Sequence, residues 1–139
     1  CVAIAPFDFG AIGESSEGDD KALRFLQGMF KECIVPLKGN TVEELINEAM
    51  ANGNKWSFIN NAEKLAKHKL LLIAAKRDSL SIPELHYYPF VNEMLKYNTE
   101  NFEYKMIDSD HSFQDKRILL TEIIEGWLEK QVQQNSNIK

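Results

Sequence analysis

The stretch Leu70-Leu-Leu-Ile-Ala-Ala-Lys-Arg-Asp-Ser-Leu-Ser-Ile-Pro83 decides the fold of this chain. Its first part, Leu70 to Ala75, is apolar without alternation, which is typical of a parallel strand covered on both faces. A polar turn follows at 76–81, and Pro83 suits the first position of a helix that we expect to reach about Tyr97. The stretch therefore predicts one strand–loop–helix unit.

The same order returns downstream. Phe102 to Ile107 predicts a second strand, Asp108 to Gln114 a polar loop, and Arg117 to about Gln133 a helix. We expect the inner side of this helix to carry Ile118, Ile123, Trp127 and Leu128. Strands that alternate with helices imply right-handed crossovers and a parallel sheet, so the predicted fold class is α/β.

The first third of the chain interrupts this alternation. Val2 to Phe7 predicts a buried strand, and the residues from Asp8 to Asp20 predict a loop. A helix should follow and end before Pro36, with an apolar stripe made of Ala22, Phe25, Leu26, Met29, Phe30 and Cys33. Thr41-Val-Glu-Glu44 is a capping box that should begin a second helix, ending at Gly53. We interpret these two helices as an insertion over one end of the sheet.

Bulk properties exclude several classes of protein. The 139 residues fit one domain, and 44% hydrophobic residues suffice for a core. A net charge of −5 argues against a nucleic-acid partner. No apolar run approaches the ~20 residues that span a bilayer, and the basic residues are too dispersed for a membrane-surface helix. Cys1 and Cys33 favour free thiols in a reducing, cytoplasmic setting, although one disulfide bridge or a lipidated Cys1 are alternatives.

Two titratable residues follow the predicted strands, where ligands bind in an open parallel sheet. Asp78 lies three positions after the first strand and His111 four positions after the second. If these strands are neighbours, both side chains project from the same edge. A buried carboxylate beside an imidazole fixes its tautomer and stabilises the imidazolium that forms in general-base catalysis. We therefore predict Asp78 and His111 as catalytic residues.

Structural interpretations remain beside this one. Asp78 could be only a turn or capping residue before Pro83. His111 could bond to Asp108 or Asp110 on the surface, or the three could bind a metal. No second histidine or cysteine stands at a suitable spacing, so we expect no metal and no cofactor.

Other candidates have simpler expected roles. We expect His68 to be solvated, His86 to pack, and Asp8 to form a structural hydrogen bond. Arg117 should pair with nearby acids or support the loop. Aromatic and sulfur-containing side chains either line a pocket under the insertion or pack it onto the sheet: Phe25, Met29, Phe30, Trp56 and Phe58.

The order of these segments resembles the α/β-hydrolase superfamily. Residues 70–83 resemble its acid-bearing strand and loop, where an apolar strand precedes Gly-x-x-Asp and a proline; Ala75 replaces the usual glycine. Residues 108–117, with 123–128, resemble its histidine loop and final helix, and residues 1–10 resemble the strand that leads into its cap. The resemblance implies the C-terminal part of that fold, with about three parallel strands. Its parts would be a core strand and the start of the cap at 1–14, a helical cap at 15–61, and the core at 62–139.

The resemblance also implies a Ser-His-Asp mechanism on an ester, thioester or amide. The family nucleophile sits in Gly-x-Ser-x-Gly, which this chain lacks; Gly13-Glu-Ser-Ser-Glu-Gly18 has the wrong spacing. We therefore expect a fragment of an esterase or peptidase that acts on a small acyl or peptide substrate, with its serine upstream of Cys1, and we expect the fragment alone to be inactive. The alternative is a non-catalytic binding or structural module. We also expect self-association, for example as a homodimer, through the first strand or the face that truncation leaves exposed.

Overall fold

Three parallel strands form the sheet of the protein, whose computed structural model describes residues 1–11, 20–34, 39, 41–97 and 100–136. The strands are β1 (Val2–Ile4), β2 (Leu70–Ala75) and β3 (Phe102–Ile107), in the order β1-β2-β3. The helices with bounds inside the described residues are α2 (Asp20–Cys33), α3 (Val42–Trp56), α4 (Ala62–Leu65), α5 (Pro83–His86), α6 (Tyr88–Met94) and α7 (Arg117–Ser136). The predicted α/β class with a parallel sheet is confirmed.

The central strand β2 is buried along its whole length, as its unbroken apolar sequence predicts. It pairs with β3 from Leu70 opposite Phe102 to Ala75 opposite Ile107. The two strands therefore end level with each other. The loops that follow them begin at the same edge of the sheet, which is the geometry that the sequence analysis requires for Asp78 and His111.

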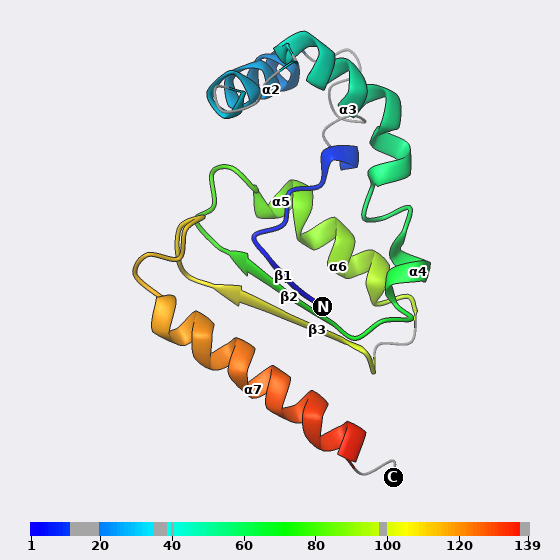
Figure 1. The fold of residues 1–139 in the computed structure, drawn as a ribbon, viewed down its shortest axis with the longest axis vertical. Helices are drawn as coiled ribbons and strands as arrows, with labels where there is room; N and C mark the ends of the chain where they lie inside the picture. The colour runs from blue at the N-terminus through cyan, green and yellow to red at the C-terminus, as the bar shows by residue number, and fades with distance from the viewer. Residues whose placement is uncertain (12–19, 35–38, 40, 98–99, 137–139) are drawn as a thin grey trace.

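Helices cover both faces of the sheet (Figure 1). On one face, α4 and α6 pack against alternate strand residues such as Leu70 and Leu72. On the other, α7 packs against Leu71 and Ile73. The α7 side chains that reach this core are Leu120, Ile123, Ile124 and Trp127.

Two residues expected on the inner side of α7 point elsewhere. Ile118 is 78% exposed and Leu128 48% exposed, so these two assignments are wrong. The buried side of the helix follows the spacing i, i+3, i+4 and i+7 from Leu120. Ile118 and Leu128 lie outside that stripe, because the helical period fixes the width of a stripe but not which side faces the sheet.

The first strand is shorter than its apolar sequence suggests. β1 ends at Ile4 instead of Phe7, because Ala5 has φ 43° and leaves the extended region. Pro6, which has no N–H, turns away from the sheet, and its carbonyl accepts a hydrogen bond of 2.5 Å from the Ser81 hydroxyl. The chain after β1 is thereby joined to the loop after β2.

The helix expected from Pro83 to about Tyr97 is divided in two. α5 ends at His86, and Tyr87 has φ −102° and ψ −60° between α5 and α6. Pro89 explains the break, because it has no N–H to donate to the carbonyl of Leu85.

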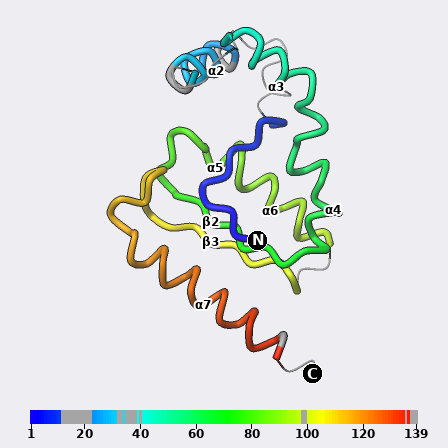
Figure 2. The backbone as a smooth tube through the Cα atoms, viewed as in Figure 1, coloured from blue at the N-terminus to red at the C-terminus, as the bar shows by residue number. Residues whose placement is uncertain are grey.

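The two helices of the predicted insertion lie together beyond α5 (Figure 2). The capping box is confirmed: the Thr41 hydroxyl accepts from the Glu44 N–H, and the Glu44 carboxylate accepts from the Thr41 N–H. α3 continues three residues past Gly53, to Trp56. Leu26 and Ile46 are the buried centre of a cluster that Phe7 and Leu85 join from outside the two helices. Its other partly buried members come from the helices themselves: Leu23, Met29, Phe30 and Val42. The side chains of Ala22 and Cys33, and residues 13–18, lie outside the described part.

No helix in the part of the chain described is both long and apolar enough to cross a membrane. Cys1 is an exposed free thiol.

The contact between the segment after β1 and the end of α3 depends on Gly10. A Cβ at this position would lie 2.5 Å from the Gly53 carbonyl oxygen and equally close to the Ser57 side chain. Gly10→Ala should therefore lower the free energy of unfolding by about 1–3 kcal/mol, because backbone must move. The matched control is Gly126→Ala in α7, where nothing lies within 4 Å; there alanine should raise stability by about 1 kcal/mol. Urea denaturation measures both, and equal shifts in one direction would contradict this packing.

Candidate functional site

The candidate site lies where the loops after β2 and β3 run side by side. Hydrogen bonds of sheet type continue past the strands, from the Lys76 N–H to the Ile107 carbonyl at 2.8 Å and from the Arg77 N–H to the Ser109 carbonyl at 3.0 Å. The next residue in the first loop is Asp78. The two loops are therefore held at a fixed spacing before the candidate residues begin.

Asp78 is held rigidly from one side. Its side chain is 1% exposed, and its Oδ1 accepts hydrogen bonds from the N–H groups of Leu80 at 2.9 Å and Ser81 at 2.8 Å. The structural role as a turn residue is thus present. These hydrogen bonds use only Oδ1, and Oδ2 points to the second loop.

His111 meets that oxygen. Its Nδ1 lies 2.8 Å from Asp78 Oδ2, and its side chain is 40% exposed. Its Nε2 has no hydrogen-bond partner in the described part of the chain, so the outer edge of the ring remains open. The structure thus brings together the two residues that the sequence analysis singles out, while their catalytic roles stay a prediction.

The loop that carries His111 is shaped by its own residues. Asp110 Oδ1 accepts from the N–H groups of Ser112 at 3.1 Å and Gln114 at 3.3 Å. Phe113 has φ 51°, a conformation that costs energy for a non-glycine residue, and its ring is buried under α7. The loop is therefore anchored in the core immediately after His111. Asp110 and Asp108 have other partners, so His111 bonds to neither.

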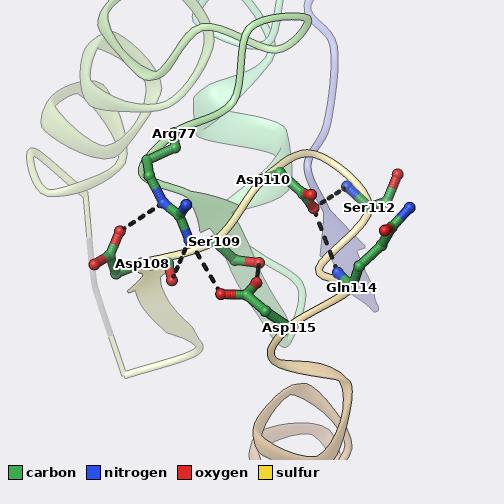
Figure 3. A network of polar contacts seen from close by, with 7 residues as sticks. All are labelled: Arg77, Asp108, Ser109, Asp110, Ser112, Gln114 and Asp115. Atoms are coloured by element: carbon green, nitrogen blue, oxygen red, sulfur yellow. Dashed lines mark hydrogen bonds and ion pairs between the residues drawn. The ribbon is translucent and has the colours of Figure 1, made fainter.

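An arginine that the sequence analysis did not consider connects the two loops (Figure 3). Arg77 Nε donates to Asp108 Oδ1 at 3.0 Å, and its Nη2 lies 3.1 Å from Asp115 Oδ2. The hydroxyl of Ser109 donates to the other Asp115 oxygen. This bond is the main reason that the pKa of Asp115 lies below its ordinary value, and Arg77 contributes less.

The arginine expected in this role was a different one. Arg117 is exposed and forms no ion pair with any described residue, so the expected pairing with nearby acids is wrong, while the alternative role of supporting the loop stays a prediction. Arg117 begins α7. The sequence feature that indicates a role for Arg77 is its position immediately before Asp78, opposite a predicted loop rich in acidic residues.

A second buried polar cluster lies behind the site. The Asp8 carboxylate accepts from the N–H groups of Gly10 at 2.9 Å and Phe58 at 3.0 Å, so its expected structural role is confirmed. The Asp8 N–H donates to His86 Nδ1 at 3.1 Å, and the Phe7 ring lies 4.4 Å from the His86 ring. Burial lowers the pKa of His86 to about 4, although attraction to Asp78 works in the opposite direction.

Both expectations for the other histidines are confirmed: His86 packs in the interior and His68 is exposed. His86 Nε2 is buried, and none of the residues with described positions hydrogen bonds to it.

The aromatic residues of the insertion divide between the two roles considered for them. A cavity of about 170 Å³ is lined by Phe9, Phe30, Leu45, Glu48, Ala49 and Trp56. Phe58 instead packs on Phe90, with ring centroids 5.5 Å apart. Met29 packs in the cluster between α2 and α3, and Phe25 is 37% exposed.

The metal-binding alternative gains no support. No group of three or more histidine, cysteine, aspartate or glutamate side chains could hold a metal ion within the described ranges. Asp108 binds Arg77 and His111 binds Asp78, so their donor atoms do not converge.

Comparisons with protein-family models, curated proteins and solved structures find no match to this chain.

Proposed function

We propose that Asp78 and His111 are the acid and base of a Ser-His-Asp triad, and that the chain is the C-terminal part of an α/β-hydrolase-type serine hydrolase. The observation that carries the proposal is the 2.8 Å contact between a buried carboxylate and an imidazole whose other edge is open. The level ends of β2 and β3 support it, because functional residues of such sheets lie beyond the carboxyl ends of the strands.

Each residue has a defined task in this mechanism. An ionised Asp78 accepts the Nδ1–H of His111, which leaves the lone pair on Nε2. Nε2 then takes the proton of a serine as it attacks the carbonyl of an ester, thioester or amide. The same nitrogen later protonates the leaving group. The buried carboxylate stabilises the imidazolium between these two steps.

The serine is proposed to come from outside residues 1–139. None of the hydroxyl or thiol groups in the described ranges hydrogen bonds to His111. Ser81 donates to the Pro6 carbonyl and Ser109 to Asp115, so these two hydroxyls have other partners. The order nucleophile, acid, histidine in this superfamily places the serine, and the oxyanion-hole N–H that follows it, upstream of Cys1.

Activity-based labelling tests this function. The complete natural protein that contains this chain should react with a fluorophosphonate probe at a single serine, found by intact mass and peptide mapping. His111→Asn should abolish labelling, because no base remains to activate the serine. Ser112→Ala, which changes an exposed hydroxyl beside His111, should leave it intact, and residues 1–139 alone should not react. A folded complete protein that resists the probe would instead support a non-catalytic binding or structural module.

A further inference from the structure

We infer that Arg77 is a positioning residue that keeps His111 against Asp78 by closing the loop that carries the histidine. The inference rests on the proposed triad for its catalytic consequence, but its structural core concerns the geometry of residues 108–115 alone. In this loop, Asp108 is the first residue after β3, and Asp115 lies just before α7. Figure 3 shows both carboxylates turned toward the guanidinium of Arg77.

One guanidinium therefore joins the two ends of the loop. It contacts Asp108 through Nε at 3.0 Å and through Nη2 to the backbone carbonyl at 3.3 Å, and it contacts Asp115 through Nη2 at 3.1 Å. Ser109 fixes the other oxygen of Asp115. The ends of the loop cannot separate without breaking these bonds.

The residue that follows Arg77 holds the opposite part of the same loop. Asp78 binds His111 at its tip, while Arg77 binds its two ends. The Arg77 N–H also donates to the carbonyl of Ser109, inside the loop. Two consecutive residues of the loop after β2 thus bind the loop after β3 at separate points. Only short stretches of backbone separate His111 from Asp108 and Asp115 at the two ends of its loop. The position of these ends therefore fixes the position of the imidazole relative to the Asp78 carboxylate.

The chemistry of this contact requires an arginine. Three acids, Asp108, Asp110 and Asp115, lie within the loop, and the two that flank it would repel each other without a cation between them. A planar guanidinium donates in several fixed directions at once, whereas a lysine ammonium is a single point charge on a flexible stem. Lysine should therefore restore the charge but only part of the geometry.

The contacts of Arg77 with Asp108 and Asp115 are exposed, so we expect them to affect the position of His111 more than the stability of the fold. The side chains of Arg77, Asp108 and Asp115 are 59%, 71% and 50% exposed. Ion pairs of this kind contribute little to the free energy of unfolding. Loss of Arg77 should therefore leave the fold intact and act on the alignment of His111, where small displacements have large effects on rate.

The experiment compares Arg77→Met and Arg77→Lys with a matched control in the complete natural protein. The control is Lys130→Met, which removes another exposed contact of 3.4 Å, to Glu103, between α7 and β3. The first measurement is the rate of fluorophosphonate labelling. The second is the downfield proton NMR signal of the His111 Nδ1–H, assigned by its loss in Asp78→Asn.

Arg77→Met should slow labelling by about tenfold to a hundredfold and broaden or remove the Nδ1–H signal, with the melting temperature nearly unchanged. Arg77→Lys should recover part of both, and Lys130→Met should alter neither. Wild-type rate and signal in Arg77→Met would overturn the inference. Global unfolding of that variant would also overturn it, since Arg77 would then serve the fold as a whole.

The two proposals fail in different ways. If the wild-type protein does not react with the probe, the hydrolase function fails. The NMR signal still decides whether Arg77 positions His111.

Discussion

Under the proposed triad mechanism, Asp78→Asn is expected to lower the labelling and hydrolysis rates of the complete protein by about 10⁴-fold while leaving it folded. The amide oxygen can still accept from the N–H groups of Leu80 and Ser81, so the turn is kept. The amide nitrogen, however, donates to His111 where the carboxylate accepted. The ring must then carry its proton on Nε2, the atom that the mechanism needs as a base.

Steady-state hydrolysis of a simple activated ester measures this effect, with circular dichroism as a check on folding. Glu84→Gln is the matched control, because it also neutralises one carboxylate, but Glu84 is exposed on α5. The control should keep the wild-type rate. A folded Asp78→Asn protein with nearly wild-type activity would show that the carboxylate has no orienting role.

Protonation of His86 should lower the free energy of unfolding by about 3 kcal/mol in acid. The loss should occur as the pH falls from the pKa of histidine in the unfolded chain to its pKa in the folded protein. Burial lowers the folded pKa of His86 from 6.5 to about 4. Burial keeps the folded ring neutral above that pKa, and a neutral ring is also what allows Nδ1 to accept the N–H of Asp8. Below the unfolded pKa the unfolded chain binds a proton that the folded chain does not. The contribution of the neutral ring is therefore complete above the unfolded pKa, declines as the pH falls, and levels off below about pH 4.

Urea denaturation of the wild type and of His86→Asn, from about pH 7 to about pH 4, tests this prediction. Asparagine can accept the Asp8 N–H but does not titrate in this range. The carboxylates titrate in both proteins, so their effect cancels in the difference between the two curves. The wild type should lose stability more steeply than the variant as the pH falls. Parallel curves would mean that the folded protein accommodates a charged His86.

The sequence predicts the centre of this molecule well. An unbroken apolar run is stable as a strand only when both of its faces are buried, and the bounds of β2 coincide with the ends of this run in the sequence. Residues 102–107 follow at the distance of one crossover and form β3 as predicted. Asp78 and His111 meet because β2 and β3 are parallel neighbours that end at a common edge, the arrangement on which the sequence-based expectation depended.

The features that the sequence analysis missed depend on conformation or on contacts in three dimensions. Nothing in an apolar run indicates that Ala5 adopts a positive φ and ends β1 early. The exposed sides of Ile118 and Leu128 depend on the rotation of α7 about its axis, which is set by packing. The role of Arg77 arises only when acids more than thirty positions away fold against it. The break at Pro89, by contrast, was visible in the sequence.

The contact between Asp78 and His111 also depends on the register in which β2 and β3 pair. A strand advances about 3.3 Å per residue, so deleting one residue within β3 would displace His111 by more than a hydrogen bond can span and would turn its neighbours to the opposite face. Extra residues between α6 and β3 would leave the pairing and the site untouched. We therefore expect insertions in this crossover to be tolerated, whereas the number of residues between each strand and its candidate site residue must stay the same.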